Sequence, residues 1–133
     1  MASGIYNRFK HHVLAGLCNV LTHTVKVALY GASYSFTATD TAYTTTGELL
    51  GVGGYTAGGA TLGSPTVSEA ATAVFDAADT SWAAATFTVN FAVLYDVTPC
   101  NTLICAIDLG GAQTVTAATF TLQYASSGII RLT

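Results

Sequence analysis

Apolar and polar residues alternate along much of this chain. The alternation is clearest over residues 86–95, where Phe87, Val89, Phe91, Val93 and Tyr95 are separated by polar or smaller residues. A period of two is typical of a β-strand that buries one face. Residues 24–30 repeat the pattern. Residues 103–109 are almost continuously apolar, as expected for a strand buried on both faces.

Shorter β-like segments follow the same rule and are separated by turn residues. They cover residues 66–68, 72–76, 113–115, 119–124 and 129–132, with Gly110-Gly111, Ala117-Ala118 and Ser126-Ser127-Gly128 as expected turns or breaks. Turn signals at such short spacing predict a mainly β protein. The expected fold is an antiparallel β-sandwich of about seven or eight strands, jelly-roll-like or immunoglobulin-like, in one domain over residues 1–133.

One segment has helical spacing instead. Ile5, Phe9, Val13 and Leu17 recur every four residues, and Ser3 is a suitable N-cap, so the pattern predicts an N-terminal helix over residues 3–17. The apolar faces of the predicted strands give the expected core, which comprises Val25, Val27, Leu29, Phe87, Val89, Phe91, Val93, Leu103, Ile107, Phe120 and Leu122.

Glycine is concentrated in residues 51–62, which read GVGGYTAGGATL and hold five of the thirteen glycines. The segment lacks both GxxxxGK[ST] and GxGxxG, so we expect a crossover between β segments and no phosphate-binding loop. Glycine permits close backbone approach, and Tyr55 is a residue type enriched at interfaces. We therefore expect an inter-chain contact here, with Tyr55, Gly58 and Gly59 at the interface.

Charged residues make up only 8% of the chain, against roughly 25% in an average domain, and the net charge is −3. So few charges suit a surface that other chains cover. The acidic balance argues against nucleic-acid binding, and no apolar run is long enough for a membrane span. The N-terminus has no secretory pattern, so we expect synthesis in the cytoplasm without a leader.

The sequence contains no recognisable catalytic or metal-binding motif. Cys18, Cys100 and Cys105 have neither zinc nor redox spacing, and we expect free thiols. Asp76 and Asp79 fit turn chemistry better than a carboxylate pair or a calcium loop. We expect no enzymatic activity, no catalytic residues, no metal and no cofactor.

Basic residues gather in the predicted helix at Arg8, Lys10, His11 and His12. Adjacent histidines do not share a helix face, which disfavours a metal site there. Two interpretations remain open: a solvated helix face, or a contact surface for an acidic partner chain. We expect these four residues to belong to an interface.

Several stretches together carry a resemblance that covers nearly the whole chain: MASGIYNRFK, TVKVALY, GYTAGGATL, VFDAADTSWAAATFT, AVLYD, LICAIDLGGAQTV and TFTLQYASSGII. In these the chain resembles a family of small virion structural proteins of tailed bacteriophages. The resemblance implies a non-enzymatic capsid cement, or decoration, protein on the capsid surface. Such a protein bridges and stabilises major capsid subunits, and its expected partners are the major capsid protein and itself, as a homotrimer.

Three alternatives stay open. The first is a tail or fibre component of the same particle. The second is a carbohydrate-binding β-sandwich for host attachment, in which Tyr34, Tyr43 and Tyr55 would stack on sugars. The third and weakest is a glycoside hydrolase, because seven scattered acidic residues do not specify the required pair of carboxylates.

Overall fold

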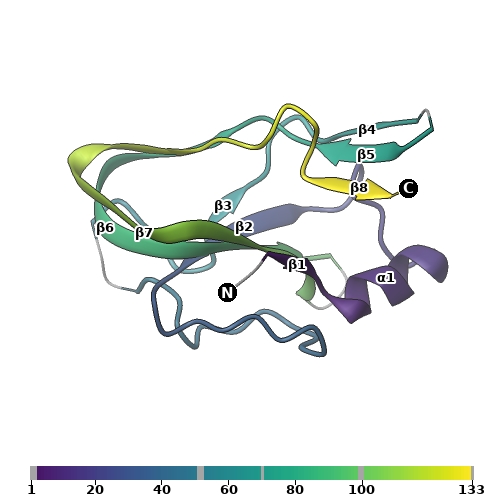
Figure 1. Ribbon diagram of the computed structural model, residues 1–133, viewed down its shortest axis with the longest axis horizontal. Coiled ribbons are helices and arrows are strands. Elements are labelled where there is room, and N and C mark those ends of the chain that lie inside the picture. Colours follow the sequence, from purple (N-terminus) through teal and green to yellow (C-terminus); the bar gives the residue numbers. More distant parts are fainter. Residues whose placement is uncertain (1–2, 51–52, 70, 99–100, 133) are drawn as a thin grey trace.

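The computed structural model describes residues 3–50, 53–69, 71–98 and 101–132, and these residues form the expected β-sandwich with an N-terminal helix. Both sheets are antiparallel (Figure 1): the larger has the order β1-β7-β6-β2-β3 and the smaller the order β4-β5-β8. The elements are β1 (Gly4–Ile5), α1 (Asn7–Leu14), β2 (Val25–Tyr30), β3 (Ala60–Thr61), β4 (Thr66–Ser68), β5 (Ala73–Asp76), β6 (Thr80–Asp96), β7 (Thr102–Leu122) and β8 (Ile130–Leu132).

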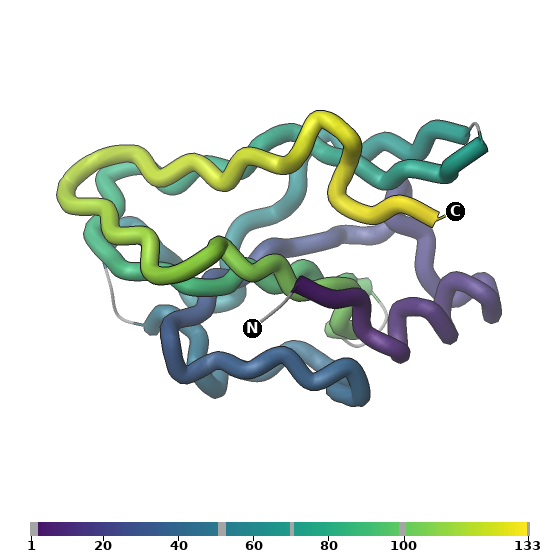
Figure 2. The backbone as a smooth tube through the Cα atoms, in the orientation of Figure 1, coloured from purple at the N-terminus to yellow at the C-terminus, as the bar shows by residue number. Residues whose placement is uncertain are grey.

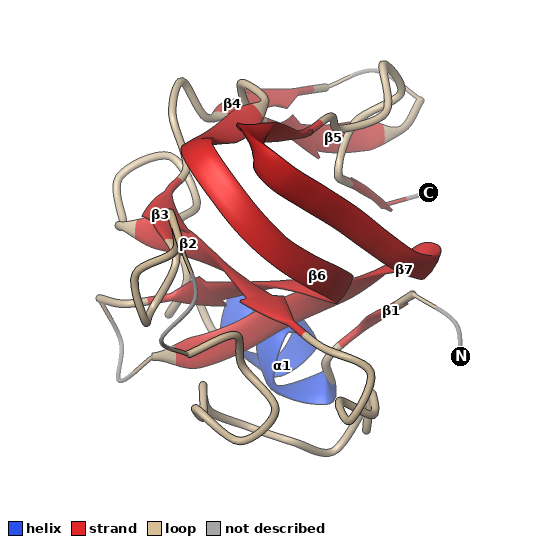
Figure 3. Cartoon of the chain, turned by 90° about the vertical axis from the view of Figure 1, so that its left-hand side faces the viewer, coloured by secondary structure: helices blue, strands red, loops and turns tan. Residues whose placement is uncertain are grey.

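One long hairpin builds most of both layers. Strands β6 and β7 pair from Thr80 with Leu122 to Asp96 with Thr102. The paired strands curve round together at the left of Figure 1, so that one half of the hairpin lies over the other half. The same course is visible in the backbone trace of Figure 2 and, turned by 90°, in Figure 3. The sandwich therefore has one end closed by continuous strands.

Bulges make this curvature possible. The β6–β7 register shifts between Trp82 and Ala85, between Ala85 and Phe87 and between Val89 and Phe91, and Ala84 has a φ of 51°. Extra residues in a ladder bend the strands and increase their twist. The expected breaks at Gly110-Gly111 and Ala117-Ala118 are wrong, because β7 continues through both. These residues have positive φ at Gly110, Gly111 and Ala117, so they belong to the curved part of the strand.

The bulges also change which side chains face the core. Phe87 and Val89 lie in the core between the layers, whereas Phe91 and Val93 lie in a second apolar cluster on the outer side of the larger sheet. An extra residue shifts the alternation of a strand by one position. Odd-numbered residues that face the core before the bulge therefore face outward after it. The uniform face predicted from residue 87 to residue 95 is therefore wrong beyond Val89.

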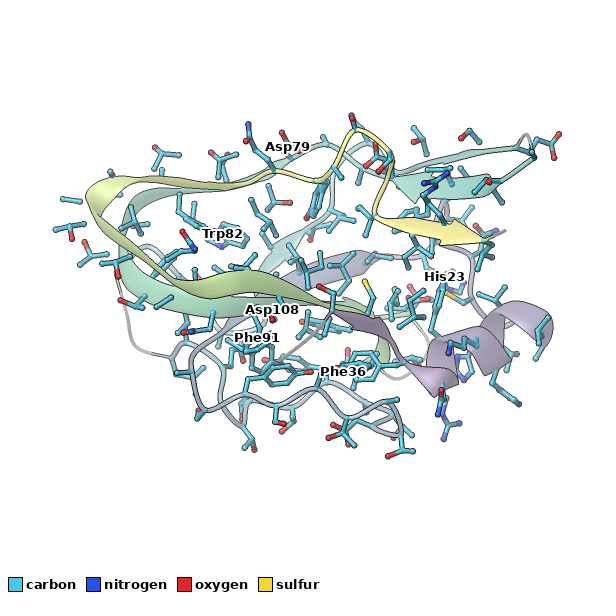
Figure 4. All side chains as sticks on the ribbon, viewed as in Figure 1. His23, Phe36, Asp79, Trp82, Phe91 and Asp108 are labelled. Atoms are coloured by element: carbon cyan, nitrogen blue, oxygen red, sulfur yellow. The ribbon has the colours of Figure 1, made fainter. Side chains whose placement is uncertain are left out.

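Both faces of the larger sheet are buried. Figure 4 shows Trp82 between the layers and Phe91 with Phe36 on the outer side, where residues 31–48 cover the sheet. The expected core is confirmed for nine residues, while Ile107 and Phe120 are only partly buried against it. The nine buried residues are Val25, Val27, Leu29, Phe87, Val89, Phe91, Val93, Leu103 and Leu122.

The N-terminal helix is shorter than the pattern predicts. Gly4 and Ile5 pair with Ala106 and Cys105 of β7, so the chain begins as an edge strand, and the helix covers only Asn7–Leu14. Ser3 does not cap it: the Ser3 hydroxyl oxygen accepts a hydrogen bond from the Asp108 N–H, 2.9 Å away. Backbone pairing with β7 thus overrides the helical spacing of the first residues.

We predict that Phe91→Ala destabilises the fold by about 3–5 kcal/mol, because it removes a side chain only 6% exposed. Its ring packs edge-on against Tyr34 at a centroid distance of 5.3 Å. Chemical denaturation of both proteins measures the difference. Thr116→Ala, at an exposed position of β7, is the control and should change stability by no more than about 0.5 kcal/mol. A loss for Phe91→Ala no larger than for the control would contradict the outer cluster.

Candidate functional site

Exposed apolar side chains gather at one end of the molecule. Seven large apolar residues are exposed among those the structure describes, and only Leu50 lies elsewhere. This end lies opposite the curve of the hairpin, where α1 and the smaller sheet face each other at the right of Figure 1. We call these six residues the apolar end surface: Val13, Leu14, Leu17, Leu21, Val67 and Leu132.

Two adjoining depressions run across this surface. The larger, about 410 Å³, lies between the loop after α1 and strands β4, β5 and β8. The smaller, about 240 Å³, lies beside α1 and is lined by Leu14 and Lys10. Phe9, Val13 and Leu132 line both, so the two form one continuous apolar groove.

Local structure explains why these residues stay exposed. Helix α1 ends at Leu14, and Gly16 turns the chain with a φ of 70°. Asn19 then holds a tight turn, in which its side-chain oxygen accepts hydrogen bonds from the N–H groups of Leu21 and Thr22. The helix buries Phe9 in the core, while Leu14 beyond it is 90% exposed. The end of the sandwich is therefore only partly covered by its own chain.

Basic residues are exposed on two of the elements that border this groove. Arg8, Lys10 and His11 are exposed on α1, and Arg131 is exposed on β8 beside Leu132. Three of the four Lys and Arg residues thus lie at this end of a chain whose net charge is −3. A partner with an apolar centre and acidic residues around it would complement this surface.

His12 does not belong to this exposed set, and its place in the expected interface is a correction. The side chain is only 9% exposed, and its Nδ1 has no hydrogen-bond partner among the residues that the structure describes. Burial lowers the pKa of His12, with further lowering by Arg8 and His11. Residue 12 points inward because it is one helical turn from Phe9, which is buried in the core.

Three polar side chains from distant parts of the sequence meet below the groove. The Cys18 thiol donates to Asp96 Oδ2 at 3.3 Å, and His23 Nδ1 lies 2.7 Å from the same oxygen. The three atoms lie within 4.8 Å of one another. Asp96 is fully buried at the end of β6, and its Oδ1 accepts from the Thr98 N–H at 3.0 Å. We call Cys18, His23 and Asp96 the cysteine cluster.

The cysteine cluster does not have the arrangement of a cysteine hydrolase. The Cys18 thiol and the His23 ring are each hydrogen-bonded to Asp96 and not to each other, unlike the Cys–His pair that activates a nucleophilic cysteine. Burial, with the adjacent Asp96, raises the pKa of the Cys18 thiol to about 12, which keeps it protonated at neutral pH. The sequence did not indicate this cluster, because its members are separated by up to 78 residues.

Cys105 does not belong to the cysteine cluster. Cys18 and Cys105 are free thiols, as expected, and Cys100 lies outside the described residues. Burial raises the pKa of Cys105 to about 12. Asp76 accepts a hydrogen bond from the adjacent Ala77 N–H, as expected for turn chemistry, whereas Asp79 accepts one from the N–H of Tyr124, which is distant in sequence.

The glycine-rich segment serves the chain's own fold, which corrects its assignment to an interface. Gly51 and Val52 lie outside the described residues, but Tyr55 is 7% exposed in the core. A Cβ on Gly59 would lie 1.9 Å from the Val27 carbonyl oxygen, so this glycine permits the close contact with β2. Gly58 is half-buried, and its carbonyl accepts from the Tyr95 hydroxyl at 2.6 Å.

Glu48 fixes this segment in place. Its buried carboxylate accepts hydrogen bonds from the hydroxyls of Tyr43 and Tyr55, both at 2.5 Å, and from the Gly58 N–H at 2.7 Å. The Tyr55 hydroxyl also accepts from the Leu29 N–H at 3.0 Å. A carboxylate with three donors offsets much of the cost of its burial.

The tyrosines considered for sugar stacking are also engaged internally. Tyr43 stacks on Tyr95 at a centroid distance of 4.4 Å, and Tyr34 packs against both Tyr30 and Phe91. The hydroxyls of Tyr6 and Tyr34 share a hydrogen bond. Tyr55 is buried, and Tyr34 and Tyr43 are half-buried by these contacts within the chain, which disfavours all three as sugar-stacking platforms.

Comparisons of the chain with protein-family models, with curated proteins and with solved structures find no match. Among the described residues, α1 is the sole helix, and it is far too short to reach across a bilayer. The apolar end surface, with its exposed apolar side chains and its groove, is therefore the candidate site on which a function can be proposed.

Burial raises the pKa of all seven tyrosines above the usual value of 10.0, to about 12 for Tyr124. A raised folded-state pKa gives stability that is fully present below the unfolded pKa and is lost as the pH rises through the folded pKa. We therefore predict that tyrosine ionisation leaves stability unchanged up to about pH 10 and lowers it above that pH.

Tyrosinate absorbance and circular dichroism, followed together against pH, check this prediction. Both should change in one cooperative step above pH 10, because the tyrosines ionise as the chain unfolds. The control is the chain in denaturant, whose tyrosines should titrate gradually near pH 10. Gradual titration of most tyrosines near pH 10 in the folded chain would contradict their burial.

Proposed function

We propose that this chain is a non-enzymatic structural subunit that binds another protein through its apolar end surface. The observation that carries the proposal is that five of the seven large apolar side chains exposed in the described part of the chain line one groove, with Leu17 in the loop beside it. Exposed apolar patches of this kind mark interaction sites in soluble proteins. The occupant we propose is a neighbouring virion subunit with an apolar surface and acidic residues around it.

The distribution of charge supports this occupant. Lys10 lines the groove, and Arg8 and His11 are exposed on the same helix. A rim of charges mainly directs association and orientation, while buried apolar contacts supply most of the affinity. Lys10 itself lines the groove beside Leu14, so apolar and basic contacts would form together.

The resemblance to small virion structural proteins supports the more specific part of the proposal. The protein is proposed to be a capsid cement protein that bridges major capsid subunits at the capsid surface, as a homotrimer. A tail or fibre component is the second candidate, because the same surface would serve either place. Carbohydrate binding is less favoured, since Tyr34, Tyr43 and Tyr55 are engaged within the chain.

We predict that replacing Leu14 and Leu17 together by Ser weakens binding to virus particles at least tenfold, because both side chains would be buried against the partner. They are 90% and 51% exposed, so the isolated fold should keep its stability. The measurement adds each purified protein to particles that lack it and determines occupancy against concentration. Leu50→Ser is the matched control: Leu50 is 50% exposed but lies away from the end surface.

Equal occupancy by the double variant and the control would contradict the proposed site. The same particles give the number of copies relative to the major capsid protein. A ratio near one supports cement, a few copies per particle support a tail or fibre component, and absence from particles contradicts a virion role. Sedimentation of the isolated chain tests the homotrimer.

A further inference from the structure

We infer that the cysteine cluster is a binding site for a zinc-like transition metal ion, held by Cys18 Sγ, His23 Nδ1 and Asp96 Oδ2. The inference rests on these three groups and is independent of the proposed virion role. It replaces the expectation from sequence that no metal is bound.

The first support is the donor set and its spacing. Thiolate, imidazole and carboxylate are the three ligand types that zinc uses in proteins. At metal–ligand distances of roughly 2.0–2.3 Å, tetrahedral ligands lie about 3.3–3.6 Å apart. The Sγ–Oδ2 distance is already 3.3 Å, and the Nδ1–Oδ2 distance of 2.7 Å needs to lengthen by only about half an ångström.

The second support is the electrostatic condition of Asp96. Its side chain is fully buried, and the sole ion-pair partner found for it in the described part of the chain is His23. Burying a carboxylate is costly, and the hydrogen bonds from Cys18, His23 and the Thr98 N–H offset part of that cost. A divalent cation would balance the charges of the Asp96 carboxylate and a Cys18 thiolate together.

The third support is the origin of the ligands. Cys18 and His23 lie in the loop that joins α1 to β2, and Asp96 ends β6 opposite Val25 of β2. Cys18 also lines the apolar groove, which gives an ion a path from solvent. The fourth position would hold water, as in zinc sites with three protein ligands.

Binding has a defined chemical balance and a structural consequence. The ion replaces the thiol proton of Cys18, which passes to solvent, while His23 binds through Nδ1 as a neutral imidazole that carries its proton on Nε2. The loop over residues 15–24 becomes linked to the end of β6. Soft thiolate with imidazole favours Zn²⁺ or Co²⁺ over Mg²⁺ or Ca²⁺.

Cobalt(II) titration of the reduced chain tests the inference. Cys100 and Cys105 are first replaced by Ala, so that Cys18 is the only remaining thiol. We expect a thiolate-to-cobalt absorption band in the near ultraviolet that saturates at one ion per chain and disappears when Zn²⁺ is added. Cys18→Ser should abolish the band, and His23→Gln should weaken binding at least tenfold.

His11→Gln is the matched control, since His11 is exposed and lies outside the cluster. Circular dichroism without metal verifies that every variant is folded. As a second readout, saturating Zn²⁺ should raise the melting temperature of the chain that keeps Cys18, with Cys100 and Cys105 replaced by Ala, by roughly 5–10 °C. The same chain with Cys18→Ser should show no such increase. No cobalt band in the Cys18 chain, or an equal band in Cys18→Ser, would overturn the site, and the three ligands would then be a hydrogen-bond cluster alone.

Discussion

The curvature of one hairpin is the constraint on which the rest of this structure depends. Strands β6 and β7 supply residues to both layers, so the core can form only if the paired strands turn back over themselves. A regular ladder cannot bend so far, and the bulges near Ala84 and Val89 supply the curvature. Each bulge also changes which residues face the core between the layers. After the bulge near Val89, Ala92 and Leu94 face this core, and Phe91 and Val93 face the outer cluster.

Curvature closes one end of the sandwich and leaves the other end to be covered by separate elements. Helix α1, the loop after it and the smaller sheet lie there, and they leave the groove of the apolar end surface between them. The cysteine cluster lies at the base of the same end, where β6 stops. The proposed docking surface and the proposed metal site are therefore both consequences of how the hairpin ends, although each is tested separately.

The alternation of apolar and polar residues predicted those strands in which every second side chain faces the core. Residues 24–30 and 86–95 are strands, and nine of the eleven expected core residues are buried. The errors arise where a long-range contact decides the outcome. Pairing with β7 converts the first helical residues into β1, and the long strand continues past Gly110-Gly111 because β6 pairs with it on both sides of them, at Asp108 and Gln113.

The candidate site was less predictable, for a related reason. Tyr55 in a glycine-rich segment has the composition of an exposed loop, but Glu48 and the approach of Gly59 to Val27 bury it. Exposure of Leu14 or Leu21 cannot be read from apolar periodicity, which indicates burial. Cys18, His23 and Asp96 carry no motif, since only the meeting of β2 with the end of β6 brings them together.

Hydrogen exchange of the chain, free and bound to virus particles, tests the central functional claim most directly. We expect the amides of residues 53–62 to be protected from exchange already in the free chain, because of their contacts with Glu48 and β2. Binding to particles should leave this protection unchanged. Binding should add protection over residues 7–22, 66–68 and 130–132, the segments that contain the residues of the apolar end surface. New protection confined to residues 53–62, with none at the apolar end surface, would contradict the proposal that this surface binds the partner.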